Sequence, residues 1–219
     1  MNRRIGRVGA ALSAGATLAF AVSMIAGLFR PTLFYSCFAS IFIALGFIPF
    51  MVSLFSLNRD GERKAAGYAG LAFAAVYAAI ILLVYYAECT TVRLNPSLSQ
   101  EALSIISFGH LGSLFFNYDL LGYACMALAA FFIGFTVEPR DKGDRILQWL
   151  LWLKAIFFLP CLLVPLFPVF TPGAGDTVGT ILLEFWCAYY LPVCLLGFRY
   201  FNRGLPQKGV IRRYAKAGK

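Results

Sequence analysis

The chain has 219 residues, of which 60% are hydrophobic and 13% are charged, and its formal net charge is +9. Soluble domains average roughly 45–50% apolar and about 25% charged residues, so this composition excludes a soluble domain. The 16% of aromatic residues excludes a disordered chain. Basic residues are scattered between apolar runs, so we expect no nucleic-acid partner. The composition predicts a membrane protein.

Six apolar runs are long enough to cross a bilayer, which takes roughly 20 residues in a helix. They cover residues 8–29, 31–57, 65–87, 112–136, 146–170 and 177–201. The first run follows a basic start but is longer than the apolar core of a signal peptide, so we interpret it as a true span. We therefore predict an all-α fold, with residues 1–219 forming a single bundle of six transmembrane helices in contact with membrane lipid.

Lys and Arg residues are distributed unevenly between the two sides of this bundle. Sixteen of the 19 lie before the first span, in the second and fourth connections, or from residue 199 onward. Because Lys and Arg are enriched in cytoplasmic segments, both termini are predicted to be cytoplasmic, in a multi-pass protein of the cell membrane.

The third connection, from Glu88 to about Leu111, is the one long connection between spans. Ser97 and Gln100 have the spacing of a helix capping box, and apolar residues follow near helical spacing. We predict a short amphipathic helix over about 98–108 that lies on the outer interface. It is either a passive cap on the bundle or a lid over a cavity.

Small residues recur at four-residue spacing in two of the spans. The first span contains Ala11, Gly15, Ala19 and Ser23, and the third contains Ala66, Gly70, Ala74 and Ala78. Small residues allow close contact between helices in lipid. We interpret both stripes as packing within the bundle; the alternative is docking against a partner membrane subunit or a second copy of the chain.

Three charged residues, Asp119, Lys154 and Glu184, fall inside predicted spans. A charge at the bilayer centre costs about 2.5–3.5 kcal/mol on insertion scales, so each one is a functional candidate. With a helix rise of about 1.5 Å per residue, the two carboxyl groups lie at one depth toward the outer face, and Lys154 lies about 13 Å deeper.

Pro160, Pro165 and Pro168 crowd the outer half of the fifth span. Each proline removes a backbone donor, so we expect this half of the helix to be distorted. Such a distortion would let Lys154 approach a carboxyl group. The alternative is that the Lys154 side chain extends toward the inner headgroups.

Other polar side chains collect at the outer level of the carboxyl groups. We predict an outward-facing pocket whose acidic floor is Asp119 and Glu184, with Ser36, Ser40, Tyr85, Asn117 and Lys154 as further ligand-binding residues. This pocket suits a cation, an amine-bearing solute or a proton. The alternative is that these side chains only form hydrogen bonds between helices and fix their positions.

A D-x-x-G-Y stretch occupies Asp119–Tyr123, and a short basic turn precedes the fifth span. With the order of its spans, the chain resembles uncharacterised bacterial six-helix inner-membrane proteins. The resemblance implies a bacterial inner-membrane location and brings no function or site residues.

The sequence predicts a protein that binds or carries a small cationic or proton-coupled solute. One alternative is a non-catalytic accessory or assembly subunit of a membrane complex. Another is a lipid-modifying enzyme in which the carboxyl groups and His110, the single histidine, perform acid–base chemistry. The chain contains no nucleotide-binding, hydrolase or metal-binding motif, so we predict no catalytic residues, metal or cofactor.

Overall fold

The computed structural model describes residues 1–58, 60–167 and 175–203, with the backbone alone for 175–178. Within these ranges the regular structure is helical throughout. The α-helices are α1 (Asn2–Gly27), α2 (Leu33–Ser56), α3 (Lys64–Ala87), α4 (Gln100–Ile106), α5 (Leu114–Gly134), α6 (Lys142–Leu153), α7 (Phe158–Leu163) and α8 (Gly175–Asn202). Short 3-10 turns cover Gly61–Arg63 and Lys154–Phe157, and a π-helical turn covers Glu88–Val92.

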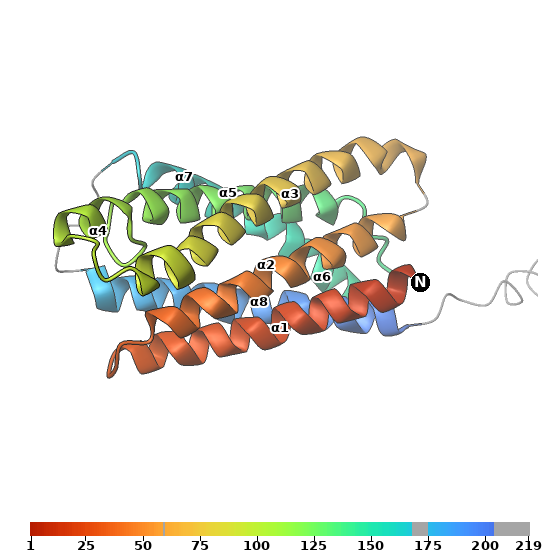
Figure 1. Cartoon of the computed structure of the whole chain (residues 1–219). Coiled ribbons are helices and arrows are strands. Elements are labelled where there is room, and N and C mark those ends of the chain that lie inside the picture. The colour runs from red at the N-terminus through yellow and green to blue at the C-terminus, as the bar shows by residue number, and fades with distance from the viewer. Residues whose placement is uncertain (59, 168–174, 204–219) are drawn as a thin grey trace, which may run out of the picture.

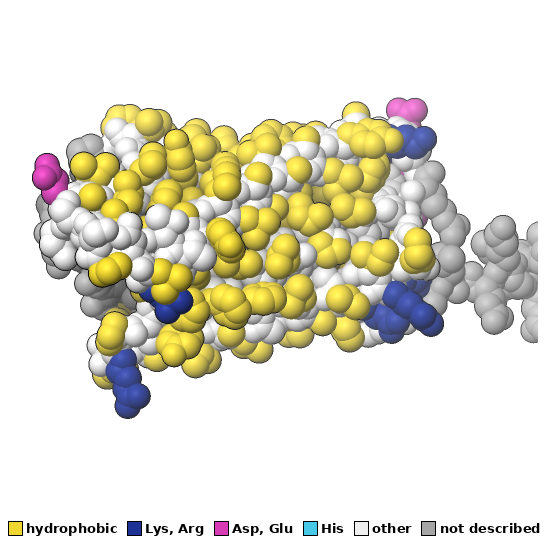
Figure 2. Space-filling model, in the orientation of Figure 1, with side chains coloured by type: hydrophobic (Ala, Val, Ile, Leu, Met, Phe, Trp, Pro, Cys, Tyr) yellow, Lys and Arg dark blue, Asp and Glu magenta, His cyan; other side chains and the backbone are white. Residues whose placement is uncertain are grey.

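Six helical segments of the described chain are long and apolar enough to cross a membrane, as the sequence predicts. They are Asn2–Gly27, Leu33–Ser56, Gly61–Val92, Leu114–Gly134, Lys142–Leu163 and Gly179–Asn202. Figure 2 shows apolar side chains covering the middle of the molecule and charged side chains near its two ends. Length and composition together mark the chain as a multi-pass membrane protein.

The helices form a closed bundle in chain order. Helix α1 packs against α2 and α8, α2 against α3, and α3 against α5. Helix α5 then contacts α6 and α7, and α6 contacts α8. The N-terminus and the last turn of α8 lie at the same end of the bundle, the terminal end, and α4 lies at the other, the α4 end (Figure 1).

Helices α1 and α2 are in backbone contact through two glycines. A Cβ atom added to Gly46 would lie 2.8 Å from the carbonyl oxygen of Gly9 and 2.7 Å from the amide nitrogen of Ser13. The Ser13 hydroxyl also donates a hydrogen bond to the carbonyl of Ile43 at 3.4 Å. Because lipid is as apolar as the helix surface, such close packing and polar contacts hold membrane helices together.

Charged side chains at the terminal end connect α6 to α8. Arg199 and Arg203 both pair with Asp141, the N-cap residue of α6, with 3.1 Å between Arg199 and Asp141. Arg140 pairs with Asp144 at 2.9 Å and donates a further hydrogen bond to a backbone carbonyl of α8 at 3.0 Å. These ion pairs fix the start of the fifth span against the end of the sixth.

Helix α4 is shorter than the helix predicted over 98–108, and its cap differs from the predicted one. Ser99 is the N-cap residue, and its hydroxyl oxygen accepts a hydrogen bond from the amide of Ala102 at 3.1 Å. Ser97 lies in the preceding turn, where its amide donates to the side-chain oxygen of Asn95 at 3.1 Å. Asn95 offers Ser97 a partner within the turn, which the capping-box pattern does not take into account.

Candidate functional site

The fifth span breaks near its middle, at the 3-10 turn Lys154–Phe157. Pro160 lies in the first turn of α7. Proline has no amide hydrogen and its ring crowds the carbonyl group four residues earlier, here that of Ile156. A tighter turn before the proline relieves this conflict. Pro165 follows the end of α7, and Pro168 lies outside the described residues.

Lys154 lies at the start of this turn and is almost completely buried, with 1% of its surface exposed. Its Nζ atom has no hydrogen-bond partner in residues 1–58, 60–167 and 175–203. The same atom lies 4.0 Å from the ring centroid of Tyr190, 5.0 Å from that of Trp186 and 5.9 Å from that of Tyr189, all on α8. An ammonium group over an aromatic face gains about 0.5–2 kcal/mol. Helix α8 therefore holds the Lys154 ammonium group inside the bundle.

Five aromatic side chains from four helices form a closed ring, the aromatic cluster. Its members are Phe47 on α2, Tyr77 on α3, Tyr123 on α5, and Trp186 and Tyr190 on α8. Successive ring centroids lie 5.1, 5.8, 5.1 and 5.1 Å apart, and 6.5 Å separates the last ring from the first. The hydroxyl groups of Tyr77 and Tyr190 are buried, and neither forms a hydrogen bond of standard geometry with the described residues.

The sequence interpretation did not include the aromatic cluster, although a signal for it exists. Tyr and Trp are enriched at the two membrane–water interfaces, where their polar tips reach water. Tyr77, Tyr123 and Tyr190 instead lie several turns inside their helices, where a hydroxyl group is costly to bury. Tyrosines in the middle of three spans therefore indicate that the interior of the bundle contains polar groups.

Asp119 lies in the second turn of α5 and is 5% exposed. Its carboxyl group interacts with the side chain of Tyr85, another predicted site residue, and lies close enough to Tyr77 and Tyr123 for electrostatic interaction. Its Oδ1 atom is buried and has no hydrogen-bond partner within the part of the chain that the structure describes. In the described chain, no Lys or Arg nitrogen lies within 4.0 Å of this carboxyl group. Asp119 is thus a buried acid surrounded by tyrosines.

Glu184, the second predicted acid, has different neighbours. Its Oε1 atom is buried without a hydrogen-bond partner, and its electrostatic neighbour is Cys187 on the same helix. No hydrogen bond between Glu184 and Asp119 is present in the described part of the chain, and Cys161 of α7 is among the neighbours of Asp119. Tyr85 is therefore the predicted site residue whose side chain interacts with Asp119, and the pairing of Asp119 with Glu184 stays a prediction.

Ser36, Ser40 and Asn117, the remaining predicted site residues, form hydrogen bonds with a neighbouring serine or with backbone carbonyls. The hydroxyl groups of Ser36 and Ser23 share a hydrogen bond of 2.8 Å between α2 and α1, and the hydroxyl group of Ser40 donates to the carbonyl of Ser36 at 3.1 Å. Asn117 donates to the carbonyl of Gly112 at 3.1 Å, while its Oδ1 atom is buried without a partner. Ser36 thus forms a hydrogen bond between two helices, and Ser40 forms one within its own helix.

No ion pair joins the carboxyl group of Asp119 to the ammonium group of Lys154 among the described residues. The buried polar groups of the bundle are therefore the Asp119 carboxyl group, with one unbonded oxygen atom among the described residues, and the Lys154 ammonium group, which lies against the rings of α8.

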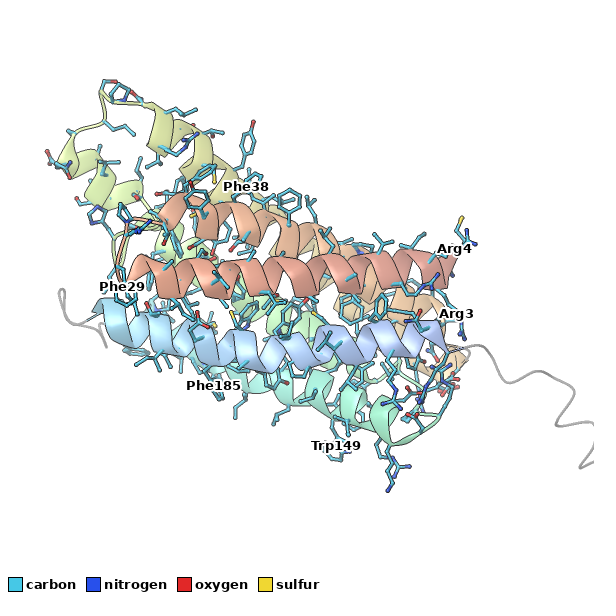
Figure 3. The ribbon with its side chains drawn as sticks, turned by 90° about the horizontal axis from the view of Figure 1, so that it is seen from below. Arg3, Arg4, Phe29, Phe38, Trp149 and Phe185 are labelled. Atoms are coloured by element: carbon cyan, nitrogen blue, oxygen red, sulfur yellow. The ribbon has the colours of Figure 1, made fainter. Side chains whose placement is uncertain are left out.

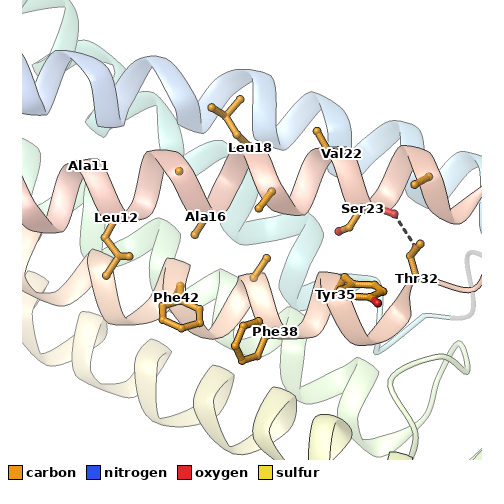
Figure 4. Close-up of a pocket in the computed structure, with 14 residues that line it drawn as sticks. Ala11, Leu12, Ala16, Leu18, Val22, Ser23, Thr32, Tyr35, Phe38 and Phe42 are labelled. Atoms are coloured by element: carbon orange, nitrogen blue, oxygen red, sulfur yellow. Dashed lines mark hydrogen bonds between the residues drawn. The ribbon is translucent and has the colours of Figure 1, made fainter.

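An apolar groove of about 780 Å³ lies on a different face, between α1 and α2 (Figure 4). Ala11, Gly15 and Ala19 of α1 line it together with Phe38 and Phe42 of α2. Figure 3 shows Phe38 directed away from the bundle, as are Trp149 and Phe185 on other helices. This groove contains none of the buried charged residues and is suited to an apolar occupant.

Comparison of the chain with known protein families, curated proteins and solved structures finds no match. The class of the protein is therefore inferred from its own structure. It is a membrane protein with six candidate spans, and its interior contains Asp119, Lys154 and the aromatic cluster. No group of three or more His, Cys, Asp or Glu residues with the geometry of a metal site occurs in the described ranges.

Proposed function

We propose that this protein binds or carries a small cationic or proton-coupled solute, and that Asp119 is the group that binds it. The observation that carries the proposal is the Oδ1 atom of Asp119, which is buried and has no hydrogen-bond partner among the described residues. A buried carboxylate is costly unless a partner compensates its charge, and ionisable groups inside membrane proteins commonly mark ion or solute pathways. A cation or a proton supplies the missing partner, and the side chain of Tyr85 offers a second oxygen atom.

In this proposal the terminal end of the bundle faces the cytoplasm of a cell membrane. Arg3 and Arg4 lie at this end (Figure 3), together with the ion-paired Arg140, Arg199 and Arg203. Lys and Arg are enriched on the cytoplasmic side of membrane proteins. Asp119 lies in the second turn of α5, counted from the α4 end, so the solute reaches it from the opposite side of the membrane.

The test is thermal unfolding of the purified protein in detergent, with increasing methylammonium or sodium at constant ionic strength. We expect at least one of the two cations to raise the melting temperature of the native protein, because a ligand that binds only the folded state stabilises it. Asp119→Asn keeps the size of the side chain and removes its charge, so it is expected to abolish the rise. Glu101→Gln, the same change at an exposed residue of α4, is the matched control and is expected to keep it.

Two results contradict this proposal. One is a native protein whose melting temperature responds to neither cation. The other is an Asp119→Asn protein that responds as strongly as the native protein.

A second candidate function is that of an accessory or assembly subunit that docks a transmembrane helix of a partner in the α1–α2 groove. The observation that favours it is Gly15, because a Cβ atom added there would meet no atom within 4 Å. The neighbouring Ala11 and Ala19 are also exposed. Small residues of this kind allow another helix to approach closely.

Cysteine cross-linking in native membranes tests this docking. We expect Gly15→Cys to form a cross-linked species, whereas Ala79→Cys, at an exposed position of α3, forms none. The native protein with its six cysteines is the background control. A species of twice the chain mass identifies a second copy, another mass identifies a different subunit, and the absence of any cross-link contradicts this function.

A further inference from the structure

The connection between α3 and α5 lies over the α4 end of the bundle and is attached there through few buried residues (Figure 1). None of the seven residues of α4 is buried. From residue 93 to residue 113, Ser107 and Ser113 are the two buried positions. A segment with so few buried contacts opens at a lower free-energy cost than the packed helices beneath it.

Glu88 holds this connection to the bundle. It is the first residue of the π-helical turn that follows α3, and its side chain is buried. One carboxyl oxygen accepts a hydrogen bond from the hydroxyl group of Ser107 at 2.8 Å, and the other accepts one from the amide of Phe108 at 3.1 Å. A buried carboxylate needs such partners, and hydrogen bonds to a charged group are stronger than those between neutral groups. Glu88 therefore fixes the position of Phe108.

The ring of Phe108 packs on side chains of α3 and α5, the helices that carry Tyr85 and Asp119. Its centroid lies 5.4 Å from that of Tyr85, in the last turn of α3, and 6.4 Å from that of Phe116, in the first turn of α5. Phe116 lies three residues before Asp119, so it is on the same face of α5 and one turn nearer the α4 end. Phe108 therefore covers Asp119 from the α4 end.

Gly112 gives this connection a point of rotation next to α5. Its φ angle is +79°, in the left-handed region that favours glycine. The next residue, Ser113, is the N-cap of α5, and its hydroxyl oxygen accepts a hydrogen bond from the amide of Phe116 at 3.2 Å. A rotation at Gly112 thus moves the connection while the cap keeps the first turn of α5 in place.

We propose that residues 107–112 form a lid over Asp119, and that Glu88 is the positioning residue that holds this lid closed. The described structure has the closed arrangement, in which the ring of Phe108 fills the opening. Opening breaks the two hydrogen bonds to Glu88 and lifts this ring, so that water at the α4 end reaches Asp119. The inference rests on the proposed function, because it names the route by which the solute reaches Asp119.

Chemical modification of carboxyl groups tests the lid without any bound cation. The full chain in lipid nanodiscs is treated with a water-soluble carbodiimide and ethylenediamine, which convert an accessible carboxyl group into an amide. Peptide mass spectrometry then gives the rate at each residue. In the native protein, we expect Asp119 to react at least about tenfold more slowly than Glu62, which is exposed at the turn before α3.

Two variants weaken the contact that holds the lid. Ser107→Ala removes the hydroxyl donor, and Glu88→Gln removes the charge and one of the two acceptor oxygens. Loss of a hydrogen bond to a charged group is expected to speed the modification of Asp119 by about tenfold. The matched controls are Ser104→Ala and Glu101→Gln, at exposed residues of α4, and both are expected to leave the rate unchanged.

Phe108→Ala acts on the lid without changing the donors to Glu88. It leaves the opening unfilled, so we expect Asp119 to react at least about tenfold faster. Asp144 reports on the rest of the bundle, because it is buried at the terminal end in its ion pair with Arg140. Its rate is expected to stay unchanged in every variant.

Three results overturn the lid. In the first, Asp119 of the native protein reacts as fast as Glu62, so that nothing covers it. In the second, none of the three lid variants speeds its reaction. In the third, Asp119 and Asp144 speed up together, because the variants then loosen the whole bundle. If the lid variants behave as expected but neither cation raises the melting temperature of the native protein, the proposed function fails and the lid remains.

Discussion

The small-residue stripes of α1 and α3 share one spacing, yet the structure uses them differently. In α3, a Cβ atom added to Gly70 would lie 2.8 Å from Ile133 of α5, and Ala74 and Ala78 are buried. In α1, a Cβ atom added to Gly15 would meet no atom within 4 Å, and the neighbouring Ala11 and Ala19 are exposed. The α3 stripe therefore packs within the bundle, as interpreted from the sequence, whereas most of the α1 stripe faces outward.

The difference shows what a stripe of small residues indicates. It predicts that another helix can approach closely at that face, because small side chains keep backbones accessible. It does not indicate which helix approaches, since lipid and protein surfaces are equally apolar in a membrane. Helix α1 makes its close contact with α2 through Gly9 and Ser13, on a face that the predicted stripe does not include. Ala11, Gly15 and Ala19 of the stripe therefore line the α1–α2 groove.

The largest expected effect comes from filling the α3 stripe. Gly70→Leu places a large side chain against Ile133 and the carbonyl oxygen of Ala129, so α3 and α5 must separate. Overpacking of this kind costs about 1–3 kcal/mol in the free energy of unfolding. Denaturant unfolding in detergent micelles measures it. If Gly70→Leu is as stable as Gly15→Leu, the contact between α3 and α5 is not as close as described.

An intermediate effect is expected at Ser23, the one residue of the α1 stripe that is buried. Ser23→Ala removes the hydrogen bond between the hydroxyl groups of Ser23 and Ser36, which costs about 1 kcal/mol. Ser56→Ala is the matched control, because the Ser56 hydroxyl bonds only the carbonyl of Val52 in its own helix and is exposed. Equal unfolding free energies for the two variants would show that the contact with Ser36 adds nothing.

The smallest effect is expected from Gly15→Leu. The added side chain enters the open groove, so the free energy of unfolding is expected to change by no more than about 0.5 kcal/mol. The same denaturant unfolding, performed at low protein concentration to keep the chain monomeric, measures this value. A loss comparable to that of Gly70→Leu would mean that the groove is already filled by packed side chains.

The six spans and the three charged residues within them can be identified from the order of residues along the chain. These are local properties, because about 20 consecutive apolar residues suffice to identify a span and a charge within it. The break in the fifth span was predicted from its prolines, but the turn lies at Lys154, where the helix adjusts before Pro160.

Which side chains meet inside the bundle depends on how the helices pack in three dimensions. The contacts of Lys154 with Trp186 and Tyr190, and of Asp119 with Tyr85, join residues more than 30 positions apart. They depend on how each helix is rotated about its axis, and an apolar span in lipid contains no strong polar face that sets this rotation. The rotation is fixed by close backbone contacts such as Gly9 with Gly46, which exist only once the helices are assembled.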